Sequence, residues 1–282
     1  MKIRNNFRTK KSLGQNFLKS EAALQKIIGV GEIVPSDTIL EIGPGKGALT
    51  ERLLVHAGKV IAVEKDRELV EFLKTKFEKE IKSRSLVLVH GDILEFEIED
   101  FLKAKAQSLK PSAYKIIANI PYNITGAILK KFLTAQKQPE RMILMVQYEV
   151  AKRIIGTNPA SPGLRRAKES ILSISVKAYG HPKMLMKVPA RYFSPAPKVD
   201  SAIIAITNIS RKLFAVQHPM LHNSKEFEEK FWQIVKKGFA HKRKKLSSNL
   251  KGLLKGKEIL VEKFGNNRAE NISLDDWLSL IS

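Results

Sequence analysis

The sequence predicts an α/β fold, in which a mostly parallel sheet is covered by helices on both faces, followed by a small all-helical region at the C-terminus. Two observations support this prediction. Short apolar segments alternate with amphipathic ones from residue 38 to residue 207, and strand patterns stop after Asn208. Because 282 residues are enough for about two domains, we expect one domain over residues 1–208 and a helical domain over residues 209–282.

The predicted elements of the first domain follow in chain order. A helix is expected over residues 20–34, where apolar residues recur at helical spacing and Ser20 can act as the N-cap. The strands expected after it are TILEIG (38–43), KVIAVE (59–64), SLVLVHGD (85–92), YKIIAN (114–119), RMILMVQ (141–147) and a final pair, MKVPARYF (186–193) and SAIIAIT (201–207). Helices are expected between them, one ending near Val55 and others over 66–81, 126–133 and 148–155. The pattern of residues 170–180 fits either a helix or a strand.

Four helices are predicted in the second domain. They are FEEKFWQIVKKGFA (227–240), LSSNLKGLL (246–254), KEILVEKF (257–264) and LDDWLSLI (274–281). Residues 230–257 hold ten basic side chains and no acidic one. On a helix these would occupy several faces, while Phe231, Trp232 and Phe239 face the core.

The charge balance indicates the kind of partner. Lys and Arg number 50 against 28 Asp and Glu, a net charge of +22, which favours a polyanion such as nucleic acid. The absence of cysteine excludes disulfides, Cys-ligated metal centres and a thiolate nucleophile. The six histidines show no metal-binding spacing, so no metal is expected. No segment approaches the roughly 20 apolar residues of a membrane span, and the basic N-terminus has no signal-peptide pattern. We therefore expect a soluble cytoplasmic protein that does not bind membranes.

A glycine-rich turn after the first predicted strand suggests a ligand site. Gly43, Gly45 and Gly47 permit tight turns and close approach of a ligand to the main chain. A P-loop is excluded because the motif G-x-x-x-x-G-K-[ST] is absent, and a dinucleotide fingerprint is excluded because its third glycine would come one residue later. An adenosyl ligand without a pyrophosphate remains, such as S-adenosylmethionine (SAM). The alternative is an ordinary structural turn.

Two carboxylates strengthen the nucleoside interpretation. Glu64 ends the second predicted strand, at the position where such folds bind the ribose hydroxyls. Asp92 ends the third strand and is suited to accept the N6 amino group of an adenine. Both would lie at the same edge of the sheet as the glycine turn.

The fourth predicted strand ends in a segment that fits methylation of an exocyclic amine. The lone pair of such an amine is delocalised into its ring, and hydrogen-bond acceptors on its protons would free it. The side-chain carbonyl of Asn119 and a backbone carbonyl held by Pro121 could supply these acceptors, and Tyr122 could stack on a flipped base. No strong general base is needed. Methylation at C5 of a pyrimidine, which normally uses a cysteine, is disfavoured. The alternative is a proline-led turn with a core tyrosine.

The segments that carry these residues resemble a known family. They are KSLGQNFL (11–18), ILEIGPGKGALT (39–50), VIAVEKD (60–66), HGDIL (90–94), IIANIPYNIT (116–125), MVQYEVAKRI (145–154) and FSPAPKVDSAII (193–204). Because these segments occur together and in this order, the chain resembles the small-subunit rRNA adenine N6-dimethyltransferases of the KsgA/RsmA group. The resemblance implies a Rossmann-like SAM-dependent methyltransferase domain followed by a small helical domain.

The resemblance also implies site residues and a reaction. SAM would be bound by Asn16, Leu18, Gly43, Gly45, Glu64, Asp92 and Asn119, and the target nitrogen would lie near Asn119, Pro121 and Tyr122, with Phe193 against the base. The implied reaction dimethylates N6 of two adjacent adenosines near the 3′ end of 16S rRNA, in an assembling small subunit. NIPYNIT and the lysine of GPGKG also occur in the related Erm enzymes, which dimethylate one adenosine of 23S rRNA, whereas LGQNFL and FSPAPKVDSA favour the KsgA group.

The basic residues are candidates for RNA contacts. They are Lys236, Lys237, Lys242, Arg243, Lys244, Lys245, Arg165 and Arg166. Phosphate contacts of this kind give salt-dependent affinity with little sequence information. The alternative is a solvated helix face or a chance match to a nuclear-localisation run.

Two other functions compete with this interpretation. They are a non-catalytic RNA-binding or ribosome-assembly factor and a small-molecule methyltransferase. Nothing in the sequence demands more than a monomer.

Overall fold

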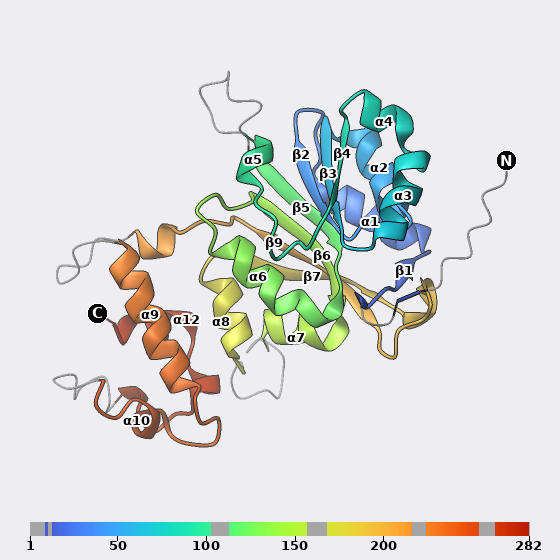
Figure 1. Ribbon diagram of the computed structural model, residues 1–282. Helices are drawn as coiled ribbons and strands as arrows, with labels where there is room; N and C mark the ends of the chain where they lie inside the picture. Colours follow the sequence, from blue (N-terminus) through green and yellow to red (C-terminus); the bar gives the residue numbers. More distant parts are fainter. Residues whose placement is uncertain are drawn as a thin grey trace. The chain divides into compact units, whose positions relative to one another are not determined.

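The computed structural model describes residues 9–10, 13–102, 113–156, 168–215, 224–253 and 263–281 (Figure 1). The chain forms two compact units: unit 1 is Met1–Ala151 with Lys183–Thr207, and unit 2 is Lys152–Pro182 with Asn208–Ser282. The segment Lys152–Pro182 thus groups with the C-terminal residues, although the sequence places it in the first predicted domain. The assignment of domains stays a prediction.

Unit 1 contains a seven-stranded sheet with the strand order β4-β3-β2-β5-β6-β9-β7 (Figure 1). The strands are β2 (Thr38–Ile42), β3 (Lys59–Glu64), β4 (Leu86–His90), β5 (Tyr114–Asn119), β6 (Arg141–Gln147), β7 (His181–Val188) and β9 (Ser201–Thr207). The neighbours from β4 to β6 pair in parallel, and β9 is antiparallel to β6. The predicted mostly parallel sheet is confirmed.

Helices cover both faces of this sheet. All five residues of β2 are buried, and successive side chains of a strand point to opposite faces. Ile39 packs into a cluster with side chains of α1, α2 and α3, while Leu40 on the opposite face has no exposed surface. The helices that begin in unit 1 are α1 (Glu21–Gly31), α2 (Ala48–His56), α3 (Arg67–Lys76), α4 (Glu78–Lys82), α5 (Glu99–Leu102), α6 (Thr125–Leu133) and α7 (Tyr148–Ile155).

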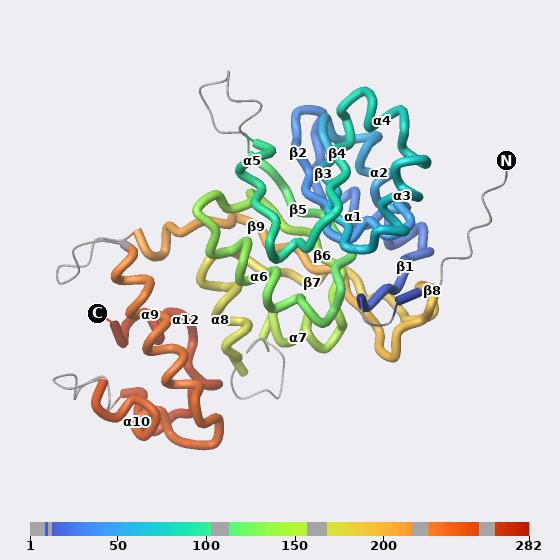
Figure 2. The backbone as a smooth tube through the Cα atoms, viewed as in Figure 1, coloured from blue at the N-terminus to red at the C-terminus, as the bar shows by residue number. Residues whose placement is uncertain are grey.

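A short second sheet holds the N-terminal segment in place. Strands β1 (Phe17–Leu18) and β8 (Phe193–Ser194) are antiparallel, with Phe17 opposite Ser194. The Lys19 amide donates to Tyr192 O at 2.8 Å and extends the pairing. Figure 2 shows the two segments side by side.

Two predicted elements differ from the structure, and the element that the sequence left open over 170–180 is a helix, each for an identifiable reason. The helix expected over 66–81 is divided at Phe77, which is buried beside Gly47. The strand expected over 186–193 is His181–Val188, and it ends before Pro189 because proline has no N–H for the ladder. Residues 171–177 form helix α8, which begins with a capping box between Ser170 and Ser173.

Unit 2 is built around aromatic side chains. Its described helices are α8 (Ile171–Lys177), α9 (Ser224–Gly238), α10 (Leu246–Asn249) and α12 (Leu274–Ser279), while most of the helix predicted over 257–264 lies outside the described residues. Phe231 and Trp277 are fully buried. Helix α9 ends at Gly238, where a Cβ would lie 2.3 Å from Trp277 Cη2. Among the described helices, none is long and apolar enough to cross a membrane.

Candidate active site

The glycine turn lies between the end of β2 and the start of α2. Gly45 and Gly47 have φ values of 60° and 78°, in the left-handed region that favours glycine. A Cβ on Gly45 would lie 2.9 Å from Phe17 Cδ1, and one on Gly47 would lie 2.6 Å from Phe77 Cε2. The glycines are therefore needed for close packing as well as for the turn.

Glu64 connects this turn to the end of β3. The Gly45 amide donates to Glu64 Oε2 at 3.1 Å, and the Asp66 amide donates to Glu64 Oε1 at 2.9 Å. Burial of the carboxyl raises the pKa of Glu64. Since each carboxylate oxygen has a second lone pair, Glu64 is held in place and can still accept hydrogen bonds from two hydroxyl groups.

Asp92 lies in the turn after β4. Its Oδ1 accepts from the Leu94 amide at 2.9 Å, and its Oδ2 accepts from Lys65 Nζ at 2.7 Å. The hydrogen bond from Lys65 holds the pKa of Asp92 below its ordinary value. The carboxylate is therefore ionised near neutral pH and acts as a hydrogen-bond acceptor.

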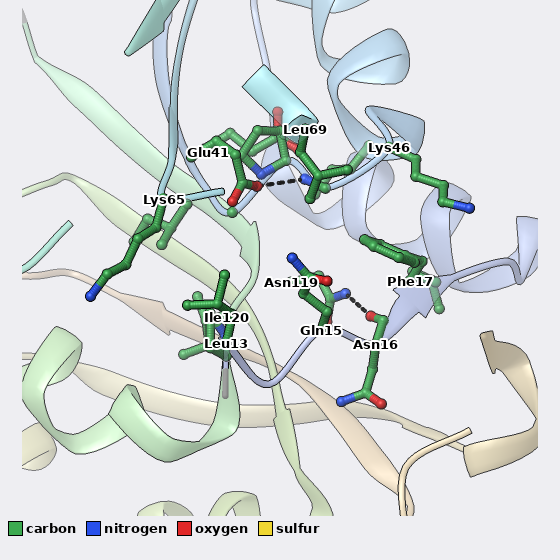
Figure 3. A pocket seen from close by; sticks show the side chains of 18 of the residues that line it. Leu13, Gln15, Asn16, Phe17, Glu41, Lys46, Lys65, Leu69, Asn119 and Ile120 are labelled. Atoms are coloured by element: carbon green, nitrogen blue, oxygen red, sulfur yellow. Dashed lines mark hydrogen bonds between the residues drawn. The ribbon is translucent and has the colours of Figure 1, made fainter. Parts of the chain in front are cut away.

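Asn119 is the last residue of β5, and its side-chain amide is oriented by the N-terminal segment. Asn119 Nδ2 donates to Asn16 O at 3.1 Å (Figure 3). This contact uses the donor side of the amide and leaves Oδ1 as the acceptor. Tyr122 follows in a 3-10 turn, and its hydroxyl is hydrogen-bonded to Ser201 Oγ of β9. Burial raises the pKa of Tyr122, so the phenol stays neutral.

One cavity of about 510 Å³ brings these segments together, entirely within unit 1 (Figure 3). Nine of the predicted site residues line it: Asn16, Leu18, Gly43, Gly45, Glu64, Asp92, Asn119, Pro121 and Tyr122. Apolar side chains such as Leu69 and Ile120 line it as well. Its size and its mixed lining suit a nucleoside-sized ligand.

Phe193 is placed differently from the other predicted residues. Its side chain is only 2% exposed and packs in the core cluster, where Phe193 lies opposite Leu18. The described residues that line the cavity include its neighbour Ser194 but not Phe193. The ring therefore faces the core in this structure. A contact between Phe193 and a target base stays a prediction.

The structure adds residues that the sequence analysis missed. Glu41 lines the cavity and accepts a hydrogen bond from Thr50 Oγ1 at 2.7 Å. Gln15 and Lys10 both bind Asp66, just beyond the Glu64 carboxylate. Gln15 lies in the motif KSLGQNFL and Ser201 in FSPAPKVDSAII, so these motifs indicate that both residues matter. Their hydrogen-bond partners, Asp66 and Tyr122, are distant in the sequence and cannot be inferred from it.

The predicted RNA-binding residues of the C-terminal region lie in unit 2. Lys236 and Lys237 are exposed near the end of α9. Lys242, Arg243, Lys244 and Lys245 are exposed in the turn between α9 and α10, not on a helix as expected, because α9 ends at Gly238. Arg165 and Arg166 lie outside the described residues.

The described residues contain no group of three or more acidic or histidine side chains that could hold a metal ion.

The arrangement fits SAM on physical grounds. Glu64 offers lone pairs for the ribose, Asp92 offers an acceptor for the adenine amino group, and the glycine turn leaves the main chain accessible. A cavity of this kind at the carboxyl edge of a mostly parallel sheet is the site expected of a Rossmann-like, SAM-dependent methyltransferase.

Comparison with known proteins gives the family. The chain belongs to the family described as "Ribosomal RNA adenine dimethylase", whose model matches residues 6–282. It is 37% identical over 280 residues to "Ribosomal RNA small subunit methyltransferase A" of Dehalococcoides mccartyi (strain CBDB1), an alignment that covers 97% of this chain and 87% of the relative.

Two solved structures are similar to nearly the whole chain. A dimethyladenosine transferase from Plasmodium falciparum has a TM-score of 0.72 at 25% identity, covering 94% of this chain and 95% of that one. The 23S rRNA methyltransferase ErmE has a TM-score of 0.68 at 25% identity, covering 94% and 98%. The predicted family and the predicted methyltransferase fold are confirmed.

Proposed function

We propose that this enzyme dimethylates N6 of two adjacent adenosines near the 3′ end of 16S rRNA, in the small ribosomal subunit, as a step of ribosome biogenesis. The observation that carries the proposal is that Asn119, Pro121 and Tyr122 line the same cavity as Glu64 and Asp92. The target amine and the methyl donor can therefore meet there. The names of the curated relatives, at 36–38% identity, support the small subunit over the Erm-type alternative on 23S rRNA.

The chain's residues have separate roles in this proposal. Bound SAM supplies a methyl group on a positively charged sulfur, which the N6 lone pair accepts while S-adenosylhomocysteine (SAH) leaves. Asn119 Oδ1 and the backbone carbonyl before Pro121 accept the N6 protons and so make the lone pair available. The Tyr122 ring, which its Ser201 contact holds, stacks on the base. The methylated nitrogen releases its extra proton to water.

A test of the reacting centre uses Asn119→Ala. Methyl transfer should fall below detection, because the amide acceptor is lost, while SAH binding weakens but remains measurable by calorimetry. Unchanged thermal unfolding would show that the variant is folded. Full activity would exclude the proposed role of Asn119.

A test of the substrate uses isotopically labelled SAM with separated, unmodified ribosomal subunits. Mass spectrometry of the digested RNA should find N6,N6-dimethyladenosine in the small subunit only. The same product only in 23S rRNA would move the enzyme to the Erm-type reaction. RNA binding without any methylation would indicate a non-catalytic assembly factor.

We also propose that the exposed basic side chains of unit 2, listed above, bind rRNA phosphates. Replacing Lys242, Arg243, Lys244 and Lys245 by Gln should weaken RNA binding and lower the magnitude of the slope of log K against log salt by roughly 0.7–0.9 per lost contact. The matched control removes four charges from exposed lysines of unit 1: Lys26, Lys74, Lys79 and Lys82. Equal effects of both quadruple variants would show that only net charge matters.

The proposed substrate places the enzyme in the cytoplasm. A monomer suffices for the proposal, since one copy of unit 1 supplies every residue of the cavity described above.

A further inference from the structure

The segment Leu13–Lys19, called here the strap, forms one wall of the SAM cavity. Its C-terminal half is fixed by the pairing of β1 with β8. Its centre is fixed by the hydrogen bond from Asn119 Nδ2 to Asn16 O. The strap therefore touches both the cavity and the amide that is proposed to act on the target amine.

The N-terminal half of the strap is fixed by Asp66. Gln15 Nε2 donates to Asp66 Oδ2 at 2.7 Å, and Lys10 Nζ donates to Asp66 Oδ1 at 2.6 Å. The Lys10 amide donates in turn to Gln15 Oε1 at 2.8 Å, which orients the Gln15 amide. The Asp66 side chain is only 3% exposed, which shields the accepting carboxylate from water, whereas the Lys10 side chain is 39% exposed.

Asp66 also contacts Glu64, the carboxylate proposed to bind the ribose of SAM. Its backbone amide donates to Glu64 Oε1, and the other oxygen of Glu64 accepts from the Gly45 amide. One short path of hydrogen bonds thus joins the strap, the proposed ribose-binding carboxylate and the glycine turn. Asp66, Gln15 and Lys10 are not among the predicted site residues, so the predicted roles leave these part-buried contacts unexplained.

We propose that Asp66 is a positioning residue, which latches the strap over bound SAM and, through Asn16, orients the Asn119 amide for methyl transfer. Loss of the latch removes the side-chain bonds that fix the N-terminal half of the strap, while the β1–β8 pairing, the Lys19–Tyr192 bond and the contact with Asn119 still hold its centre and C-terminal half. SAM and SAH then escape faster, and the Asn119 acceptor is less well aligned. The proposal rests on the cavity being the SAM site.

The charge state of the latch is set by its partners. Burial acts to raise the pKa of Asp66, but hydrogen bonds from Lys10 and Gln15 outweigh it and hold the pKa below its ordinary value. The carboxylate is therefore ionised throughout the neutral range and accepts from both donors.

The test exchanges a carboxylate and an amide across the latch. Asp66→Asn keeps an acceptor for the Glu68 amide at the start of α3, since Asn caps helices as well as Asp. However, it replaces the oxygen that accepts from Gln15 Nε2 by an amide N–H₂, so two donors face each other and the hydrogen bond is lost. Gln15 cannot rotate its amide without losing the bond from the Lys10 amide. The second change, Gln15→Glu, restores an acceptor both towards the new side-chain amide at position 66 and towards the Lys10 amide.

Stopped-flow measurement of SAH dissociation gives a readout that is independent of catalysis. Asp66→Asn should speed dissociation about tenfold, the size expected for losing a hydrogen bond to a charged group. It should also lower kcat with little change in KM for rRNA. The double variant Asp66→Asn with Gln15→Glu should recover most of both losses. Ser273→Ala, which removes a helix cap in unit 2, controls for a general loss of stability.

Several outcomes would overturn the latch. These are unchanged SAH dissociation in Asp66→Asn, no recovery in the double variant, or an equal effect in Ser273→Ala. If the unmodified protein did not bind SAH, the cavity assignment itself would fail. If it bound SAH and showed the latch behaviour without methylating rRNA, the proposed substrate would fail and the latch would stand.

Discussion

Two buried glutamates on neighbouring strands have different environments. Glu64 accepts two backbone N–H groups, whereas the hydrogen bond that Glu41 accepts comes from the Thr50 hydroxyl. Glu41 is 1% exposed, and burial raises its pKa to about 8. Glu41 is therefore protonated in the ligand-free protein at neutral pH and packs as an uncharged group in the cavity wall.

The raised pKa of Glu41 predicts a pH-dependent stability. Between the ordinary value of 4.5 and about 8 the folded state binds the extra proton, so stability falls as pH rises through this window. The contribution of Glu41 has a slope of up to about 1.4 kcal/mol per pH unit. Glu41→Gln should remove it, so that the variant gains stability relative to the unmodified protein from pH 5 to pH 8. Urea unfolding of the ligand-free proteins measures this, and parallel pH profiles would contradict the assignment.

The contact between Tyr122 and Ser201 predicts a coupled effect on catalysis. Removing either hydroxyl, by Tyr122→Phe or Ser201→Ala, should loosen the aromatic ring and lower kcat by roughly fivefold, equivalent to about 1 kcal/mol. SAH affinity should change little. Because both variants lose the same hydrogen bond, the double variant should be no worse than the single ones. Additive losses in single-turnover experiments would show that the two hydroxyls act separately.

At the scale of elements, helix and strand ends position the site. Strand β5 ends at Asn119, and α2 is preceded by its N-cap Gly47, whose left-handed backbone and missing Cβ allow Phe77 to pack against the glycine turn. The same packing divides the helix that the sequence predicts over 66–81. A close approach between elements 30 residues apart therefore decides the local structure at both places.

Two glycine substitutions should have opposite effects on stability. Gly47→Ala forces an L-residue into left-handed backbone and brings a Cβ within 2.6 Å of the buried Phe77 ring, so it should destabilise by roughly 2–4 kcal/mol. Gly29 lies on the exposed side of α1, and a Cβ added there would have no neighbouring atom within 4 Å. Gly29→Ala should therefore stabilise the protein by roughly 0.5–1 kcal/mol. Denaturant unfolding measures both. A neutral Gly47→Ala would show that the turn can move.

In the molecule as a whole, the cavity and the side chains proposed to bind RNA lie in different units. Unit 1 contains the cavity, and unit 2 carries the exposed basic residues proposed to bind RNA. The net charge of +22 is unfavourable for a protein alone and favourable beside a polyanion.

Ligand linkage predicts the response of the full chain to SAH. A ligand that binds only the folded state at 100 times its Kd adds about 2.7 kcal/mol of stability. The thermal midpoint should therefore rise with SAH concentration, whereas adenosine diphosphate, which carries a pyrophosphate, should have little effect at the same concentration. A midpoint that does not respond to SAH would contradict SAM binding.

The class of fold, the family and nine of the residues that line the cavity could be predicted from the sequence alone. These depend on local signals: apolar periodicity, glycines that permit the turn, and carboxylates that end strands. Strand ends in a parallel sheet meet at one edge, so the sequence alone predicts that Glu64, Asp92 and Asn119 lie together.

Contacts between residues far apart in the sequence became visible in the folded structure alone. The pairing of Gln15 with Asp66, the contact of Tyr122 with Ser201, and the burial of Phe193 all join segments more than 50 residues apart or depend on a core shared by many elements. No local pattern encodes such contacts, because they result from how the whole chain packs. For the same reason the sequence misplaced the end of α9, where Trp277 packs against Gly238.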